Sequence, residues 1–145
     1  MNIFFEIHQD IPREGPGSYQ SMLKALSLLP SLPPTPSILD VGCGPGTQTI
    51  ALAKETGGKV IAVDTHQPFL DRLAHQARVD GLAQRIEVAN ASMSSLAFPE
   101  ESFDVIWSEG AIYIMGFVQG LRAWRPLLKT GGYVAVTELA WVKAD

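Results

Sequence analysis

The chain has 145 residues, of which 46% are hydrophobic and 18% are charged, and its formal net charge is −4. This length suits one domain with a buried core, and the acidic balance without a basic run argues against a nucleic-acid partner. Because Cys43 has no second cysteine to pair with, and neither a long apolar segment nor a signal-peptide pattern occurs, we expect a cytoplasmic protein without membrane contact.

The first predicted element is a helix that begins after Ser18, a good N-cap, and runs to about Leu29, with apolar residues at helical spacing. Four prolines between residues 30 and 36 exclude regular structure and indicate a stiff linker. We therefore expect residues 1–36 to form an N-terminal helical extension with a proline-rich linker, and residues 37–145 to form the main domain.

Apolar runs alternate with helical patterns along the rest of the chain. A helix with Thr47 or Thr49 as its cap is predicted to end near Lys54, another extends from about Pro68 to Gly81, and a third is shortened by Pro126. Gly131-Gly132 is expected to turn the chain into the last strand. Such alternation predicts an α/β fold with a mostly parallel sheet covered on both faces; the expected strands are 38–41, 59–64, 85–90, 104–108 and 133–139.

The first expected strand leads directly into three glycines spaced two apart, Gly42, Gly44 and Gly46, and then into a helix. Glycine tolerates positive φ and lets a ligand approach the backbone, and such a turn presents N–H groups at the carboxyl end of a strand. The spacing differs from the dinucleotide fingerprint, because Thr47 stands where the third glycine of that fingerprint would fall.

The segment LDVGCGPGT, residues 39–47, resembles the first motif of class I S-adenosylmethionine-dependent methyltransferases. The resemblance implies a Rossmann-like, doubly wound sheet of about five strands that binds S-adenosyl-L-methionine. The family normally adds two more strands after the fifth strand. The sequence shows no pattern for them, so we expect the sheet to lack these two strands. The fifth strand would then be an uncovered edge, through which a homo-oligomer could form.

The resemblance also implies residue roles in cofactor binding. The backbone of Gly42, Cys43 and Gly44 would hold the methionine end, and Asp40 would bind the amino group, organise the turn, or do both. Asp64, twenty residues after Gly44, would accept the ribose hydroxyls, although a helix cap is the alternative reading of this aspartate.

Further along the chain, Thr65 would lie against the adenine or ribose. Ser92 occupies the position of the family's adenine-binding aspartate, a departure that predicts a weaker contact, while the Met93 amide can still serve the ring. Tyr19 is expected to close over the cofactor.

The segment after the fourth strand carries the expected catalytic residues. Its position beside the methyl group places Ser108 at the cofactor, and Glu109 and Tyr113 where they could orient an acceptor or take its proton. The alternative for Glu109 is that it only bonds loop amides. The three histidines are far apart in sequence, so no metal site is predicted.

The function that these features indicate is transfer of a methyl group to a small molecule by in-line displacement, a reaction in which the protein mainly orients the reactants. The first alternative is a nicotinamide-dependent oxidoreductase, favoured by the spacing of Gly44 and Asp64 but disfavoured by Thr47. The second is a non-catalytic remnant that binds the cofactor or nothing.

Overall fold

The computed structural model describes residues 11, 15–141 and 143. Their sheet has five strands in the order β3-β2-β1-β4-β5, and every pair of neighbours is parallel. The predicted α/β, Rossmann-like class is thus confirmed. The strands are β1 (Ser37–Val41), β2 (Lys59–Asp64), β3 (Ile86–Asn90), β4 (Phe103–Glu109) and β5 (Leu128–Thr137).

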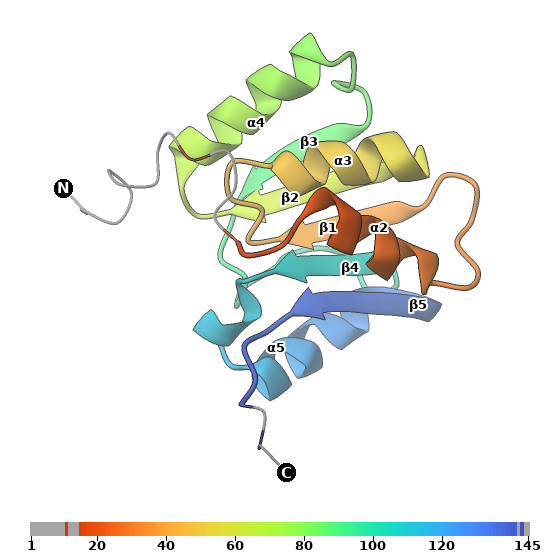
Figure 1. Ribbon diagram of the computed structural model, residues 1–145, viewed down its shortest axis with the longest axis vertical. Coiled ribbons are helices and arrows are strands. Elements are labelled where there is room, and N and C mark those ends of the chain that lie inside the picture. The colour runs from red at the N-terminus through yellow and green to blue at the C-terminus, as the bar shows by residue number, and fades with distance from the viewer. Residues whose placement is uncertain (1–10, 12–14, 142, 144–145) are drawn as a thin grey trace, which may run out of the picture.

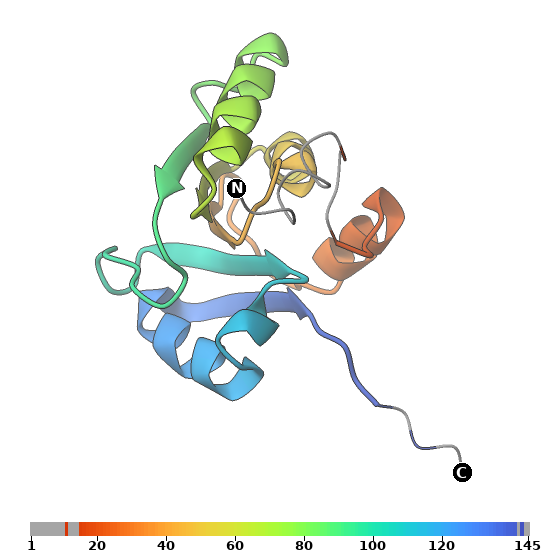
Figure 2. The ribbon, with the colours of Figure 1, turned by 90° about the vertical axis from the view of Figure 1, so that its left-hand side faces the viewer.

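The helices cover both faces of the sheet (Figures 1 and 2). One face carries α2 (Tyr19–Ser27), α3 (Thr47–Thr56) and α4 (Gln67–Val79), whose apolar side chains share a core cluster with β1, β2 and β4. The other face carries α5 (Phe117–Trp124) and the segment between β3 and β4. Two short 3₁₀ turns, η1 (Ile112–Ile114) and η2 (Arg125–Leu127), flank α5.

The order of the strands follows from the crossovers. The chain moves from β1 outward to β3 and then returns to place β4 on the other side of β1. The carboxyl ends of β1 and β4 therefore meet at a switch point, where open α/β sheets bind their ligands. In Figure 1 the carboxyl ends of the strands lie on the left, where the arrowheads of β4 and β5 point.

Helix α2 begins as predicted at Ser18, whose hydroxyl accepts from the Ser21 amide at 3.1 Å in a reciprocal capping box. Its Met22 is 2% exposed and belongs to the same core cluster as α3 and α4. The first helix thus packs onto the sheet domain, and the division at residue 36 stays a proposal.

Two local predictions are wrong. Neither threonine caps α3: its N-cap is Gly46, with φ of 86°, and Thr49 instead donates its hydroxyl proton to Asp40. Strand β5 does not start after the glycine pair but at Leu128, because the chain continues through an irregularity opposite Phe103 and Val105 in which Gly131 takes φ of 81°. The glycines thus form a bulge inside the strand.

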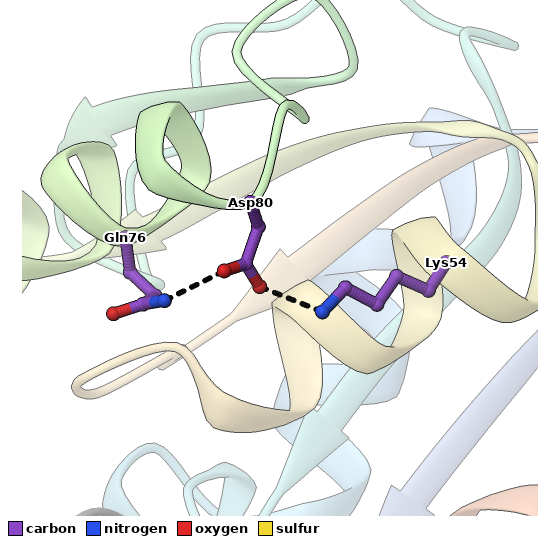
Figure 3. Close-up of polar contacts among 3 residues, drawn as sticks. All are labelled: Lys54, Gln76 and Asp80. Carbon is purple, nitrogen blue, oxygen red and sulfur yellow. Dashed lines mark hydrogen bonds and ion pairs between the residues drawn. The ribbon is translucent and has the colours of Figure 1, made fainter.

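The ends of α3 and α4 are joined at the surface. Asp80, the C-cap of α4, accepts from the Lys54 ammonium and from the Gln76 amide, both at 2.7 Å (Figure 3). A carboxylate is unfavourable at a helix C-terminus, and the Lys54 charge offsets this effect. Both hydrogen bonds, and the Lys54 charge after them, lower the pKa of Asp80.

Candidate cofactor and acceptor site

A cavity of about 380 Å³ opens at the carboxyl ends of the central strands. Its walls come from the turn after β1, the end of β2, the turn after β3 and the segment after β4, with Gly15 and Phe69 completing it. These segments lie far apart in sequence and converge only because the sheet is parallel. The lining includes Gly42, Cys43, Gly44, Asp64, Thr65, Ser92, Met93, Glu109 and Tyr113 of the predicted residues.

The glycine turn adopts the conformation that its composition predicts. Gly42 and Gly44 have φ of 72° and 53°, values that favour glycine. A Cβ atom on Gly42 would stand 2.5 Å from the Cβ of Ala111, so the turn is packed tightly against the segment after β4. The two walls of the cavity therefore hold each other in place.

From the sequence we expected the N–H groups of this turn to be presented to a ligand. In the structure they donate to other groups of the protein. The N–H groups of Gly42 and Cys43 both donate to the Val63 carbonyl, at 2.8 and 3.0 Å, and Gly44 N–H donates to Asp64 Oδ2 at 2.9 Å. The turn is stabilised by the neighbouring strand β2 instead. Contact between these amides and a methionine tail stays a prediction.

Asp64 joins the turn to the start of α4. Besides Gly44, its carboxylate accepts the His66 amide on Oδ1 at 2.9 Å, and the N-cap of α4 is His66, so Asp64 does not take the alternative role of helix cap. Each carboxylate oxygen has two lone pairs. Asp64 can therefore accept ligand hydroxyls while it keeps both amide bonds.

Asp40 lies beneath the turn, fully buried, and is not part of the cavity wall. Its Oδ2 accepts the Thr49 hydroxyl at 2.6 Å, whereas its Oδ1 has no hydrogen-bond partner. The pKa of Asp40 is raised to about 7, chiefly by burial and also by the negative charges of Glu109 and Asp64, while the Thr49 hydrogen bond acts in the opposite direction. Of the two predicted roles, this position supports organisation of the turn.

The turn after β3 presents Ser92 and Met93 to the cavity. The hydroxyls of Ser92 and Ser94 are 2.8 Å apart, and the Trp124 indole donates to the Met93 carbonyl at 2.9 Å. The backbone here is thus anchored to α5. The adenine contacts predicted for Ser92 and Met93 stay predictions, as does the contact of Thr65.

The carboxylate of Glu109 is held by a tryptophan. Trp107, which is buried and shares a face of β4 with Glu109, donates its indole N–H to Glu109 Oε1 at 2.9 Å. Ser108, on the opposite face, is fully buried, donates to the Val41 carbonyl at 2.8 Å and does not line the cavity. Tyr113, 61% exposed, stands at the cavity mouth.

Some residues that line the cavity were not predicted from the sequence. Gln48 is buried in the first turn of α3, where its amide donates to the Cys43 carbonyl at 2.9 Å. Phe69 is a buried residue of α4 that also reaches the cavity and meets the His66 ring edge-to-face at 4.5 Å between centroids. Gln48 and Phe69 each come a few residues after a turn that was predicted to bind the ligand. Their position in the sequence could therefore have indicated that they line the cavity. Tyr19, by contrast, donates to Glu55 at 2.6 Å and does not line the cavity.

The charged residues of the described cavity lining are all acidic. Asp64 and Glu109 line it, Asp40 lies behind it, and the described lining contains no lysine or arginine. Such a site attracts cations and repels phosphate groups. S-adenosylmethionine carries a sulfonium and an ammonium against one carboxylate, so the donor set fits this cofactor and disfavours a dinucleotide with its pyrophosphate.

No group of three or more potential metal ligands of the His, Cys, Asp or Glu type occurs among the described residues. In the same part of the chain, every helix is too short or too polar to cross a membrane.

The fold and the site define a Rossmann-like domain with an acidic cavity at its switch point. A family model described as a methyltransferase domain matches residues 38–132. The chain therefore belongs to the methyltransferase-domain family, in agreement with the resemblance of its glycine motif.

Individual relatives agree with this assignment. The chain is 31% identical over 103 residues to methyltransferase GfsG of Streptomyces halstedii, covering 70% of this chain and 37% of that protein. It is 28% identical over 114 residues to a sterol 24-C-methyltransferase of Yarrowia lipolytica, covering 77% of this chain and 29% of that protein. The chain thus spans only about a third of the length of these two relatives.

Solved structures share the fold. The X-ray structure of YJHP from E. coli superposes with a TM-score of 0.81 at 23% identity, over 92% of this chain and 54% of that one. A second structure is the geranyl diphosphate C-methyltransferase of Streptomyces coelicolor, solved with Mg²⁺, geranyl diphosphate and S-adenosyl-L-homocysteine. It superposes with a TM-score of 0.73 at 18% identity, over 81% of this chain and 45% of that one.

Proposed function

We propose that this chain binds S-adenosyl-L-methionine and transfers its methyl group to a small molecule by in-line displacement. The observation that carries the proposal is one cavity whose walls bring together the glycine turn, Asp64 and Glu109 without a cationic side chain among the described lining residues. The cofactor supplies an already activated methyl group, so the protein needs to orient and enclose the reactants rather than to form a covalent intermediate.

Asp64 is the residue proposed to hold the cofactor most directly. A carboxylate that accepts two hydroxyls of a ribose makes charge-assisted hydrogen bonds, and its two amide bonds already fix its orientation. Gly42, Cys43 and Gly44 would hold the methionine end, and Thr65, Ser92 and Met93 the nucleoside. Asp40 and Ser108 would act through the backbone that they support.

Glu109 and Tyr113 are proposed as the residues that face the acceptor. A carboxylate beside the reacting centre can accept the proton of an acceptor hydroxyl or amine, and it can attract the sulfonium before transfer. Trp107 acts on this carboxylate as a positioning residue, because its indole N–H fixes one of the two oxygens.

Calorimetric titration of the protein with S-adenosyl-L-homocysteine and with NAD tests the proposal. We expect the homocysteine compound to bind and NAD to bind far more weakly, because the described lining residues offer its pyrophosphate no lysine or arginine. Preferential binding of NAD would favour the oxidoreductase alternative. Binding of the cofactor without transfer to any member of an acceptor panel would favour the non-catalytic alternative.

We further propose that the protein is cytoplasmic and binds neither nucleic acid nor membranes. We also propose that it associates with a second copy of itself through β5. Strand β5 has β4 as its only neighbour in the described sheet, and an exposed edge can pair with a second copy. Sedimentation at rising protein concentration tests this; a monomer at every concentration would contradict it.

A further inference from the structure

Four apolar residues with exposed side chains follow β4 within a short stretch of the chain, and two of them line the cavity. Tyr113 and Ile114 belong to η1, and Phe117 and Val118 begin α5; their exposed fractions are 61%, 66%, 44% and 52%. We call these four residues the apolar lip. In Figure 1 the lip segment lies between β4 and α5, on the left, at the end of the sheet to which the arrowheads of β4 and β5 point.

The lip is continuous with the cavity, because Tyr113 and Ile114 also line it. It is also fixed in place. Ile112, between the cavity wall and the lip, is fully buried, and a Cβ atom on Gly120 would stand 2.6 Å from its side chain. Glycine at this position of α5 thus lets η1 pack directly against the helix, so the lip is a preformed surface.

The size of the cavity leaves little room for an acceptor body. Pockets for drug-sized ligands measure about 300–1,000 Å³, and this one, at about 380 Å³, is at the small end of that range. A cofactor as large as S-adenosylmethionine would occupy most of it. The remainder of an acceptor must then extend outward across the mouth, where the lip lies.

The charge of the lining restricts the reacting end of the acceptor. Asp64 and Glu109 face the cavity and no lysine or arginine among the described lining residues could neutralise an anion. A phosphate or carboxylate close to the reacting atom would be repelled, whereas a neutral or cationic group would not.

On the basis of the proposed function, we propose that the acceptor is an amphiphile: its apolar body covers the lip, and its reacting end, neutral or cationic, enters the cavity beside Glu109. Burial of apolar surface on the lip supplies affinity, and the acidic lining selects the reacting end.

The test uses three simple probes below their micelle concentrations: decyltrimethylammonium, octyl glucoside and decyl sulfate. Each is titrated calorimetrically into the protein saturated with S-adenosyl-L-homocysteine. We expect the cationic and the neutral probe to bind, and the anionic probe to bind at least tenfold more weakly. Equal or tighter binding of decyl sulfate would overturn the inference.

Two matched variants locate the binding. Val118→Glu places a charge on the lip at a residue that does not line the cavity, whereas Val79→Glu makes the same change at the end of α4; the two exposed fractions are 52% and 67%. We expect Val118→Glu to weaken octyl glucoside binding at least tenfold and Val79→Glu to leave it unchanged. An equal effect of both would overturn the inference, as would a dimer that only Val118→Glu dissociates, since the lip would then be covered by a second copy.

Failure of the inference is distinguishable from failure of the proposed function. Both variants are expected to bind S-adenosyl-L-homocysteine like the unaltered protein. If that compound binds but no probe does, the inference alone is wrong. If that compound does not bind the unaltered protein, the proposed function is wrong and the inference falls with it.

Discussion

The carboxyl group of Asp40 is the most unusual single residue of the domain. It is fully buried, one of its oxygens has no hydrogen-bond partner, and its pKa is raised by burial first and then by two further carboxylates. An unpaired buried polar atom costs free energy. Its position below the glycine turn suggests why the cost is tolerated: the Thr49 bond ties the end of β1 to α3 at the point where the turn must be rigid.

This carboxyl predicts a pH dependence of stability. Its pKa is about 7 in the folded protein against an ordinary 3.8, so between these values the folded state retains a proton that the unfolded state has lost. Asp40 therefore lowers the free energy of unfolding as pH rises from about 4 to about 7, and the cost is complete above that. The expected size is on the order of a few kcal/mol.

Urea unfolding near pH 5 and near pH 8 checks this prediction. Asp40→Asn removes the titrating group, so its stability relative to the unaltered protein is expected to increase between the two conditions. Asp71→Asn, at an exposed residue of α4, is the control and is expected to show no such change. A parallel pH response of the unaltered protein and Asp40→Asn would show that Asp40 does not titrate in this range.

Asp64→Ala is expected to weaken S-adenosyl-L-homocysteine binding about 10-fold to 100-fold, from loss of hydrogen bonds to a charged group. The substitution also removes the bonds that orient Gly44 and His66. Calorimetric titration measures the effect, with Asp71→Ala as the control for a lost carboxylate outside the cavity. An unchanged dissociation constant in Asp64→Ala would exclude the ribose role.

At the scale of elements, the contact between the glycine turn and the segment after β4 makes a sharper prediction, because the chain offers a matched pair of glycines. Gly42 and Gly81 have nearly the same φ, 72° and 70°, so alanine at either pays a left-handed backbone cost of about 1–2 kcal/mol. Only at Gly42 does the added methyl group collide, with Ala111; nothing lies within 4 Å of it at Gly81.

Gly42→Ala is therefore expected to lose about 1–3 kcal/mol more stability than Gly81→Ala through overpacking, and to lose cofactor binding as well. Chemical denaturation and titration with S-adenosyl-L-homocysteine measure the two effects. Equal stability of the two variants would mean that the turn yields easily, and that the two cavity walls do not hold each other.

Asp104 links three strands from the opposite end of the sheet. Its Oδ2 accepts the Ser37 amide at the start of β1, at 2.8 Å, and the Lys129 ammonium on β5, at 3.0 Å. Asp104→Ala should cost about 1–3 kcal/mol, since it leaves a partly buried backbone N–H unpaired. Lys129→Met keeps that bond and should cost less, as measured by urea unfolding. An equal loss in both variants would assign the whole effect to the ion pair.

At the scale of the whole molecule, the sequence predicted a doubly wound, mostly parallel sheet of about five strands and most of the cavity wall, because both depend on local signals. Apolar runs fix the strands, and the glycine turn and Asp64 must meet wherever β1 and β2 pair in parallel. The bonds of the Gly42 and Cys43 amides to Val63 could not be predicted, because they depend on the register between two strands. The apolar lip also escaped notice, since exposure depends on which residues α5 leaves uncovered.

The summed charge of the domain leads to the last prediction. The chain carries a net charge of −4, and Asp64 and Glu109 concentrate negative potential at the cavity. S-adenosyl-L-methionine has one net positive charge, whereas its product has none, because the sulfonium becomes a neutral thioether on transfer. Long-range attraction should therefore favour the substrate form, and salt should screen that attraction, with a Debye length of about 10 Å at about 0.1 M.

The dissociation constant of S-adenosyl-L-methionine is thus expected to rise several-fold as ionic strength increases from about 0.02 M to about 0.3 M, while that of S-adenosyl-L-homocysteine changes little. Glu109→Gln should reduce the difference between the two ligands, because it removes a charge from the cavity wall. Glu87→Gln, at an exposed residue of β3, should leave the difference intact. The same salt dependence for both ligands would show that the acidic lining does not sense the sulfonium, and selectivity would then rest on hydrogen bonds and shape.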